Sequence, residues 1–206
     1  MNAPATVPPA TIYIIRHGEK LGAAESDSDG GPDLSVKGSA RAAALPSLFL
    51  PGTVELSCAP NPVPPIDCQV YTAGYRKVGE DGLTPRFSAP QFLFATKRSF
   101  ESNRPFETVA GLSAALALET NQEYKDNEYP LLAKKILGDP IYAGKVVLIG
   151  WHHGTIPSLA NALGIPNPPP WPGPNVFDRV WVITYDSSGA HLKDQPQQLL
   201  YKDSDT

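Results

Sequence analysis

The chain has 206 residues, of which 41% are hydrophobic and 18% are charged, with 23 prolines and a formal net charge of −4. This length suits one domain with a substantial core, and the composition is ordinary for a soluble protein. A net negative charge without a basic block argues against a nucleic-acid-binding surface, and no apolar run reaches the length that spans a membrane. We therefore expect a cytoplasmic protein with neither nucleic acid nor membrane as a partner.

Three segments are distinguished by composition. Residues 1–10 lack the cationic start and apolar centre of a secretory signal, and are expected to form a flexible leader rich in proline and alanine. Residues 11–206 are expected to form a single domain. Within it, residues 51–90 are irregular and are interpreted as an insertion that carries no chemistry, with Arg76, Lys77 and Arg86 as solvated charges.

The insertion holds the two cysteines of the chain, Cys58 and Cys68, on either side of a proline-rich loop. Short strands are predicted at residues 54–56 and 69–71. A disulfide and a reduced pair of thiols are both compatible with this spacing, which matches no zinc site.

The first strand is predicted from the uninterrupted apolar residues 12–15. Such a run indicates a strand that is buried on both faces, usually in a parallel sheet. It ends at Arg16-His17-Gly18, and ligands of open α/β sheets bind just beyond the carboxyl ends of the strands. Arginine offers donors that match a phosphate, and a neutral imidazole offers a nucleophilic nitrogen.

The next elements alternate between helix and strand. Ser35 is a plausible N-cap for a helix that Pro46 should kink or end, and a second buried strand is predicted at residues 91–96. A helix is predicted to begin at Arg104, with Pro105 in its first turn, which would place this arginine at a helix N-terminus where an anion is favoured.

The second half continues the alternation. A helix is predicted near residues 129–137, and a third central strand at 145–151 leads into His152 and His153. Thr155 is expected to cap a helix that extends to residue 163. A terminal antiparallel hairpin is predicted from residues 179–185 and 198–201. The alternation predicts a three-layer α/β/α sandwich with a mostly parallel central sheet and a C-terminal antiparallel hairpin.

Arginine and histidine residues follow three of these strands. Arg16 and His17 follow the first, Arg104 follows the second after a loop, and His152 or His153 follows the third. Two arginines and two histidines around one point would hold a phosphoryl group and place an imidazole in line with its phosphorus.

The sequence also resembles the histidine phosphatase superfamily, the phosphoglycerate-mutase-like group, from residue 11 to about 185. The resemblance rests on YIIRHGE at residues 13–19, LSVKG at 34–38 followed by Arg41-Ala42, SNRPFET at 102–108, and WHHG at 151–154. It implies a phosphatase that acts on a phosphomonoester or a phosphohistidine. His17 would be the nucleophile that becomes a phosphohistidine, and Arg16, Arg104 and His153 would bind the phosphoryl oxygens.

The resemblance favours His153 over His152, because the histidine of the family directly precedes a small residue. Adjacent residues of an extended chain also point to opposite sides, so only one of the two is expected to face the pocket. His152 is therefore interpreted as a structural or rim residue, and His191 as solvated. No acid is assigned, since Glu19, Glu107, Glu123, Asp126 and Glu128 are all available.

Three alternatives stay open. A phosphoglycerate-mutase-like transfer would use the same four residues, although the span from Arg104 to His153 leaves little sequence for the extra helices that mutases of the family carry. A non-catalytic phosphate- or partner-binding domain would share the fold. A metal site of His17, His152 and His153 would be disfavoured by the two arginines. We expect no metal and no organic cofactor, and a small phosphorylated substrate or a phosphoprotein as the partner.

Overall fold

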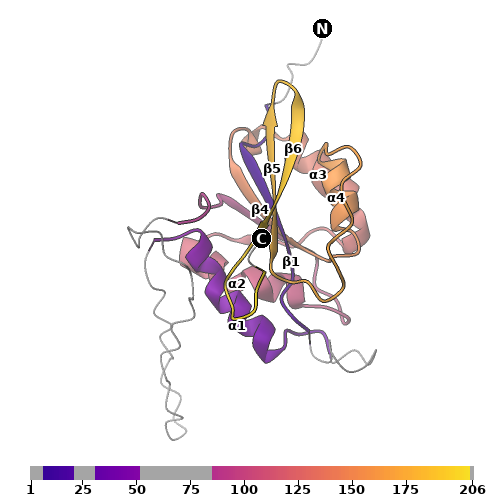
Figure 1. The fold of residues 1–206 in the computed structure, drawn as a ribbon. Helices are drawn as coiled ribbons and strands as arrows, with labels where there is room; N and C mark the ends of the chain where they lie inside the picture. The colour runs from indigo at the N-terminus through magenta and orange to yellow at the C-terminus, as the bar shows by residue number, and fades with distance from the viewer. Residues whose placement is uncertain (1–6, 21–30, 52–84, 205–206) are drawn as a thin grey trace, which may run out of the picture.

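The computed structural model describes residues 7–20, 31–51 and 85–204 (Figure 1). A six-stranded sheet runs through the molecule, with the strand order β3-β2-β4-β1-β5-β6. The strands are β1 (Thr11–Arg16), β2 (Phe92–Ala95), β3 (Thr120–Asn121), β4 (Val146–Trp151), β5 (Arg179–Asp186) and β6 (Gly189–Pro196). The helices are α1 (Val36–Ala44), α2 (Arg104–Leu116), α3 (Tyr129–Gly138) and α4 (Ile156–Ala162), with 3-10 helices at Leu45–Leu48, Asp126–Glu128 and Pro140–Tyr142.

The strand β1 is central in the sheet, as its continuous apolar run predicts. It pairs in parallel with β4, where Thr11 lies opposite Val146, and antiparallel with β5, where Thr11 lies opposite Thr184. Strand β2 is parallel to both β3 and β4, and β5 and β6 form an antiparallel hairpin. The predicted mostly parallel sheet with a terminal hairpin is therefore confirmed.

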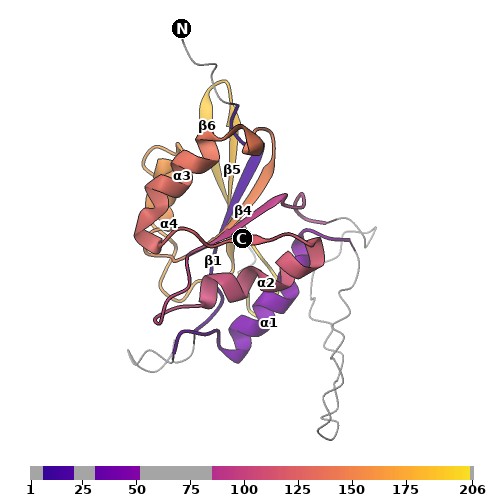
Figure 2. The same cartoon turned by 180° about the vertical axis from the view of Figure 1, so that it is seen from behind.

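Helices cover the sheet on both faces, which confirms the three layers. Figure 2 shows α3 and α4 together on one side of the sheet and α1 and α2 together on the other. The core under α3 and α4 includes Leu132 and Leu159, and the core under α1 and α2 includes Leu45 and Leu112. Residues of β1 alternate between the two cores, which is why all its apolar residues are buried.

Helix boundaries near the site follow the predicted signals. The Ser35 hydroxyl accepts a hydrogen bond from the Gly38 amide and caps α1, which ends at Ala44, two residues before Pro46. Helix α2 begins at Arg104 with Pro105 in its first turn. It packs closely on β4, because a Cβ at Gly150 would lie 3.1 Å from the Pro105 carbonyl oxygen. None of the described helices is long and apolar enough to cross a membrane.

Two predictions in the second half of the chain are wrong in part. The second hairpin strand is Gly189–Pro196, not residues 198–201, because β6 is a mostly exposed edge strand and lacks an apolar signal. Leu199 instead packs into the core under α1 and α2. Thr155 precedes α4, but its hydroxyl does not cap the helix; it accepts a bond from Trp151 Nε1 and donates one to Asp126.

The ends of the leader and of the insertion are attached to the domain. The Ala10 amide donates to the Lys145 carbonyl over 2.9 Å, and the Pro8 carbonyl accepts from Gly144 over 3.0 Å. Arg86 is half-buried and bonds Gln198, so it is not the solvated charge expected. The cysteines, the two short strands, Arg76 and Lys77 of the insertion, and residues 1–6 of the leader lie outside the described residues.

Candidate functional site

A cavity of about 730 Å³ opens beyond the carboxyl ends of β1, β2 and β4. The strands place their following residues here because three parallel neighbours end on the same edge of the sheet. The cavity is lined by Arg16, His17, Lys20, Thr96, Lys97, Arg98, Ser99, Glu101, Ser102, Arg104, Lys125, Asp126, Asn127, His152, His153 and Gly154. The predicted residues Arg16, His17, Arg104 and His153 therefore all line one cavity.

His17 is held with one ring nitrogen bonded to the backbone. Its Nδ1 lies 2.7 Å from the Gly18 carbonyl oxygen, which can only accept, so Nδ1 carries the proton. The His17 amide donates to the Trp151 carbonyl, and the Gly18 amide donates to the Thr108 hydroxyl. Burial, reinforced by the nearby His152, lowers the pKa of His17 well below 6.5. The ring is therefore neutral at pH 7, with Nε2 as the unprotonated nitrogen.

The sharp turn after His17 depends on two glycines. A Cβ on Gly18 would lie 2.9 Å from the Gly38 carbonyl oxygen, and a Cβ on Gly38 would lie 2.3 Å from the Glu19 carbonyl oxygen. The first turn of α1 thus contacts the backbone of residues 18 and 19 directly. The LSVKG and RHGE segments of the sequence therefore lie in direct contact.

Arg16 is fixed by a loop that is distant in sequence. Its Nη1 donates to the carbonyls of Pro174 and Val176, and its guanidinium lies 3.7 Å from the centre of the Phe177 ring. Its Nε has no hydrogen-bond partner among the described residues. Burial lowers the pKa of Arg16 to about 10, with Glu19 opposing the shift and Arg104 adding to it. Arg16 remains a cation at pH 7.

Arg104 adds a second cation from the first residue of α2. Its Nη1 donates to the Gly31 carbonyl over 2.8 Å, and its backbone carbonyl accepts from Thr108. Its charge contributes to the lowered pKa of His17 and of His152, which places it close to both rings. Arg104 and His17 thus converge on the same cavity, as the sequence predicts.

Both histidines after β4 line the cavity, so the expectation that only one would face it is wrong. The strand ends at Trp151, and the His152 carbonyl accepts bonds from both Thr155 and Ile156 in a turn. The alternation of an extended strand therefore does not apply to these two residues. His152, not His153, packs edge-on against the His17 ring, with the ring centres 5.2 Å apart.

The two histidines differ in their electrostatic surroundings. Burial lowers the pKa of His152, opposed by Asp126 and assisted by Arg104 and Arg16. Burial, together with Arg16 and His152, lowers the pKa of His153 to about 4. Both rings are therefore neutral at pH 7 without a bound anion. His191, by contrast, is exposed on β6 beside Asp186, as expected.

Asp126 is the one carboxylate among the five candidates that lines the cavity. It accepts a hydrogen bond from the Thr155 hydroxyl. The other four carboxylates are not among the residues that line the cavity, and they bond elsewhere in the protein. Glu107 accepts from the Leu34 amide, Glu123 from Asn121, Glu128 from the Lys125 amide, and Glu19 from Arg41. The sequence names Asp126 as one of five available carboxylates but does not single it out, because nothing in its neighbourhood marks it as closer to the site than Glu123 or Glu128.

Glu19 belongs to a buried ion network that joins the His17 turn to α1 and to the end of the chain. Arg41 donates to both oxygens of Glu19, at 3.0 and 2.8 Å, and to both oxygens of Asp203, at 2.8 Å each. All three side chains are buried, whereas Lys37, which also pairs with Glu19, is exposed. Despite the opposing effect of burial, the pKa of Glu19 is lowered by Arg41, so Glu19 is ionised and structural.

Within residues 7–20, 31–51 and 85–204, no group of three or more histidine, cysteine or carboxylate side chains is arranged to hold a metal ion. The cavity instead presents arginine and lysine side chains, which are ligands for anions.

Comparisons with known proteins bear on the fold. No family model matches the chain, and no curated protein matches it by sequence. Among solved structures, a mycobacterial hydrolase is 14% identical with a TM-score of 0.52, over 89% of this chain and 96% of that chain. A mycobacterial glucosyl-3-phosphoglycerate phosphatase is 13% identical with a TM-score of 0.49, over 92% and 98% of the chains. A phosphoglycerate mutase from Bacillus anthracis is 12% identical with a TM-score of 0.45, over 94% and 95%.

The likeness to the mycobacterial hydrolase, at 14% identity and a TM-score of 0.52, shows a shared fold and nothing further. At these identities a shared fold says nothing of which reaction or which substrate this chain has.

Proposed function

We propose that this chain is a phosphatase that hydrolyses a phosphomonoester, or a phosphohistidine, through a covalent phosphate on His17. The observation that carries the proposal is the state of His17: a buried, neutral imidazole whose Nδ1 proton is bound by the Gly18 carbonyl, beside two arginines in one cavity. A nucleophilic imidazole needs this tautomer, because the attacking nitrogen must be unprotonated.

The reaction would proceed in two in-line steps. In the first, His17 Nε2 forms a bond to phosphorus while the bond from phosphorus to the ester oxygen breaks, and the leaving oxygen takes a proton. In the second, water attacks phosphorus, the bond to Nε2 breaks, and inorganic phosphate leaves. Arg16 and Arg104 would stabilise the equatorial oxygens in both steps, since fixed donors need no reorganisation.

His152 is the better candidate for the second histidine of the site. Its ring contacts that of His17, and the charges of Arg104 and Arg16 both act on it. An anion bound among these cations would raise the pKa of His152 and allow it to donate a hydrogen bond to a phosphoryl oxygen. The sequence resemblance favours His153, so the two single variants decide between them.

Asp126 is the candidate proton donor for the leaving oxygen. It lies in the cavity, close enough to His152 to affect its pKa, and the Thr155 hydroxyl orients it. Replacement by asparagine should slow the hydrolysis of phenyl phosphate about 10²-fold, since positioned acids contribute roughly 10²–10⁴-fold. Hydrolysis of p-nitrophenyl phosphate should change little, because its leaving group needs no proton. Equal losses on both substrates would exclude Asp126 as the acid.

Mutase activity is the competing reaction of the same residues. Residues 117–145 form β3, α3 and two 3-10 helices. The 3-10 helix Asp126–Glu128 contributes Asp126 and Asn127 to the cavity lining, whereas no residue of α3 lines the cavity. This favours release of the phosphoryl group to water. Inorganic phosphate that accumulates in step with substrate loss would distinguish a phosphatase from a mutase, and a non-catalytic domain would bind phosphate without either change.

The direct test is rapid quenching at alkaline pH with a ³²P-labelled phosphoester, followed by mapping of the labelled peptide. The label should be acid-labile and should lie on the peptide that contains His17. His17→Ala should lose both label and turnover. Label on another peptide, or an active His17→Ala variant, would contradict the mechanism.

A further inference from the structure

We propose that Trp151 and Thr155 form a hydrogen-bond relay of fixed direction, which keeps the proton of Asp126 on the carboxyl oxygen that is available to the substrate. Both are positioning residues, since they act on the reaction through Asp126. The inference rests on the proposed function, because it takes Asp126 as the proton donor. It adds which oxygen of Asp126 donates the proton and which two residues determine this.

The relay begins at an indole that is enclosed by the protein. Trp151, the last residue of β4, is 0% exposed and belongs to the core under α3 and α4. Its Nε1 donates to the Thr155 hydroxyl oxygen over 3.0 Å. An indole N–H donates and cannot accept, so this contact has one possible direction. The hydroxyl proton of Thr155 must therefore point away from Trp151.

The hydroxyl proton of Thr155 has two candidate acceptors. One is Asp126 Oδ1, which is the nearer, and the other is the His152 carbonyl oxygen, 3.3 Å away. That carbonyl already accepts from the amides of Thr155 and Ile156, at 3.1 Å each, and a carbonyl oxygen has two lone pairs. The hydroxyl proton therefore goes to Asp126 Oδ1.

This direction determines where a proton on Asp126 resides. Oδ1 accepts from a hydroxyl that has no other place for its proton, so a second proton on Oδ1 would oppose the first. The carboxyl proton is therefore held on Oδ2. Asp126 lines the cavity, and its side chain makes no second hydrogen bond within residues 7–20, 31–51 and 85–204. Oδ2 is thus the oxygen that the leaving group can reach.

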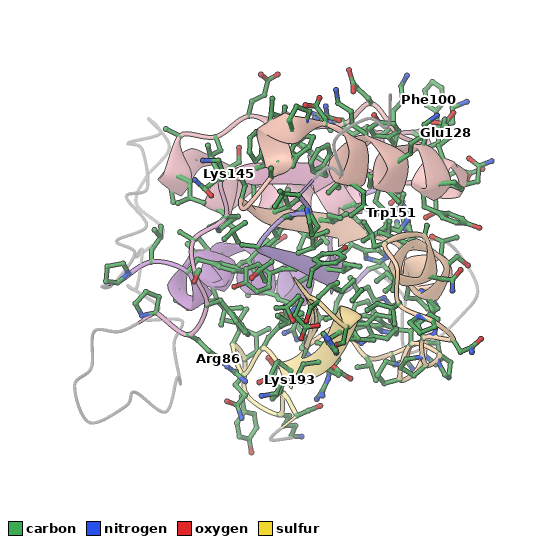
Figure 3. All side chains as sticks on the ribbon, turned by 90° about the horizontal axis from the view of Figure 1, so that it is seen from above. Arg86, Phe100, Glu128, Lys145, Trp151 and Lys193 are labelled. Carbon is green, nitrogen blue, oxygen red and sulfur yellow. The ribbon has the colours of Figure 1, made fainter. Side chains whose placement is uncertain are left out.

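The backbone holds both ends of the relay in place. Asp126 is the first residue of a 3-10 helix that is closed by two bonds between Lys125 and Glu128: the Lys125 amide donates to the Glu128 carboxylate, and the Glu128 amide donates to the Lys125 carbonyl. Thr155 directly precedes α4. Figure 3 shows Trp151 and Glu128 on the same side of the molecule. The relay therefore joins two elements that are each fixed by their own contacts.

The relay has a defined part in the first step of hydrolysis. The bond from phosphorus to the ester oxygen breaks with its electron pair, and this oxygen takes the proton from Asp126 Oδ2. Asp126 becomes a carboxylate, and the bond that Thr155 donates to Oδ1 becomes charge-assisted and stronger. The relay thus stabilises Asp126 most when its proton has left. In the second step, Oδ2 takes a proton from the attacking water.

The test compares two substrates on the full chain. Phenyl phosphate needs a proton on its leaving oxygen and p-nitrophenyl phosphate does not, so the ratio of kcat/KM for the second to that for the first reports proton donation. Thr155→Val should raise this ratio about tenfold, as loss of one hydrogen bond would, and Thr155→Ser should restore it. Trp151→Phe removes the indole N–H and should raise the ratio by about threefold.

Thr108→Val is the matched control, because it removes another hydroxyl that bonds near the site. The Thr108 hydroxyl accepts from the Gly18 amide over 2.8 Å and donates to the Arg104 carbonyl over 2.7 Å. It supports the turn of the nucleophile and does not contact Asp126. Both rates should therefore fall in Thr108→Val while their ratio stays the same, as for any defect that is only structural.

A second readout is independent of turnover. The proton NMR resonance of the Trp151 indole N–H is assigned by its loss in Trp151→Phe. In Thr155→Val this resonance should move upfield, because its acceptor has been removed, and in Thr108→Val it should keep its position. A resonance that does not move in Thr155→Val would overturn the relay whatever the rates are.

Asp126→Asn separates failure of the relay from failure of the proposed function. If Asp126→Asn raises the ratio and Thr155→Val does not, the relay is overturned and Asp126 remains the acid. If neither variant raises the ratio, both the acid and the relay are overturned. If both raise it but no label forms on His17, the relay stands and the covalent mechanism does not.

Discussion

The buried network of Glu19, Arg41 and Asp203 predicts a large loss of stability when Arg41 is replaced by glutamine. Arg41 makes four charge-assisted hydrogen bonds to two carboxylates whose side chains are 8% and 3% exposed. Removing one partner of a buried ion pair costs about 3–5 kcal/mol, because a charge is left without compensation. Arg41→Gln leaves two buried carboxylates, Glu19 and Asp203, without their cation. We therefore expect the free energy of unfolding to fall by at least about 3 kcal/mol.

The assay is urea unfolding of the unaltered chain and of the variant at pH 7. With a denaturant dependence of roughly 2 kcal/mol per molar urea, the loss corresponds to a midpoint shift of about 1.5 M or more. Lys37→Gln is the matched control, because it removes a cation that pairs with the same Glu19 but is 58% exposed. An exposed pair contributes at most about 1 kcal/mol, so this variant should shift the midpoint by less than about 0.5 M.

The loss should also depend on pH in one direction. Arg41 lowers the pKa of both Glu19 and Asp203 against the opposing effect of burial. Groups with a lowered pKa contribute stability above the ordinary carboxyl pKa of about 4, and this contribution is lost as the pH falls through the folded-state value. The difference between Arg41→Gln and the unaltered chain should therefore be complete at pH 7 and narrow below about pH 4. A loss no larger than that of Lys37→Gln, or one that is independent of pH, would refute the reasoning.

Three further predictions concern the candidate site. His152→Ala should lower kcat about 10²–10³-fold, as loss of an oxyanion donor does, and His153→Ala should lower it less. A larger loss of kcat for His153→Ala in steady-state kinetics would make His153 the second histidine of the site. Because the pKa of His17 is lowered, its ring should stay neutral as the pH falls. The acid limb of the kcat/KM profile should therefore lie below pH 6.5 after correction for substrate ionisation, and an acid limb above pH 6.5 would contradict this. Gly38→Ala should lower the thermal midpoint and turnover together, since its Cβ would collide with the Glu19 backbone, whereas Gly154→Ala, which meets nothing within 4 Å, should retain the thermal midpoint.

Sequence patterns predicted the fold well where burial is strong. The apolar runs of β1, β2 and β4 are buried on both faces, so each was recognisable and their shared sheet edge followed. Strand β6 was missed because one exposed edge strand with the sequence GAHLKDQP has no hydrophobic pattern to detect. Its position is determined by pairing with β5, which is a tertiary effect.

The candidate site was predictable only as far as residues next to strand ends. Arg16, His17 and Arg104 directly follow or soon follow a recognisable element, and all three line the cavity. The choice between His152 and His153 required the local backbone, because a turn replaces the strand at this point. Lys125 and Asp126 lie at the start of a 3-10 helix, next to the Tyr124 carbonyl that accepts a hydrogen bond from the Lys97 amide. This contact between distant segments is one that no local pattern encodes.

The position of β1 has a consequence for how the chain folds. This strand carries the first site residues, yet its neighbours β4 and β5 begin 135 and 168 residues after Thr11. Loop-closure entropy must be overcome before such distant pairings are rewarded, so topologies of this kind fold slowly. During synthesis the apolar segment Ile12-Tyr13-Ile14-Ile15 has neither neighbour available until β4 has been made at Val146–Trp151, and it lacks its second neighbour until β5 has been made at Arg179–Asp186. An unpaired strand of this composition is prone to associate with other chains, so β1 is both the scaffold of the candidate site and a segment at risk of aggregation before folding is complete.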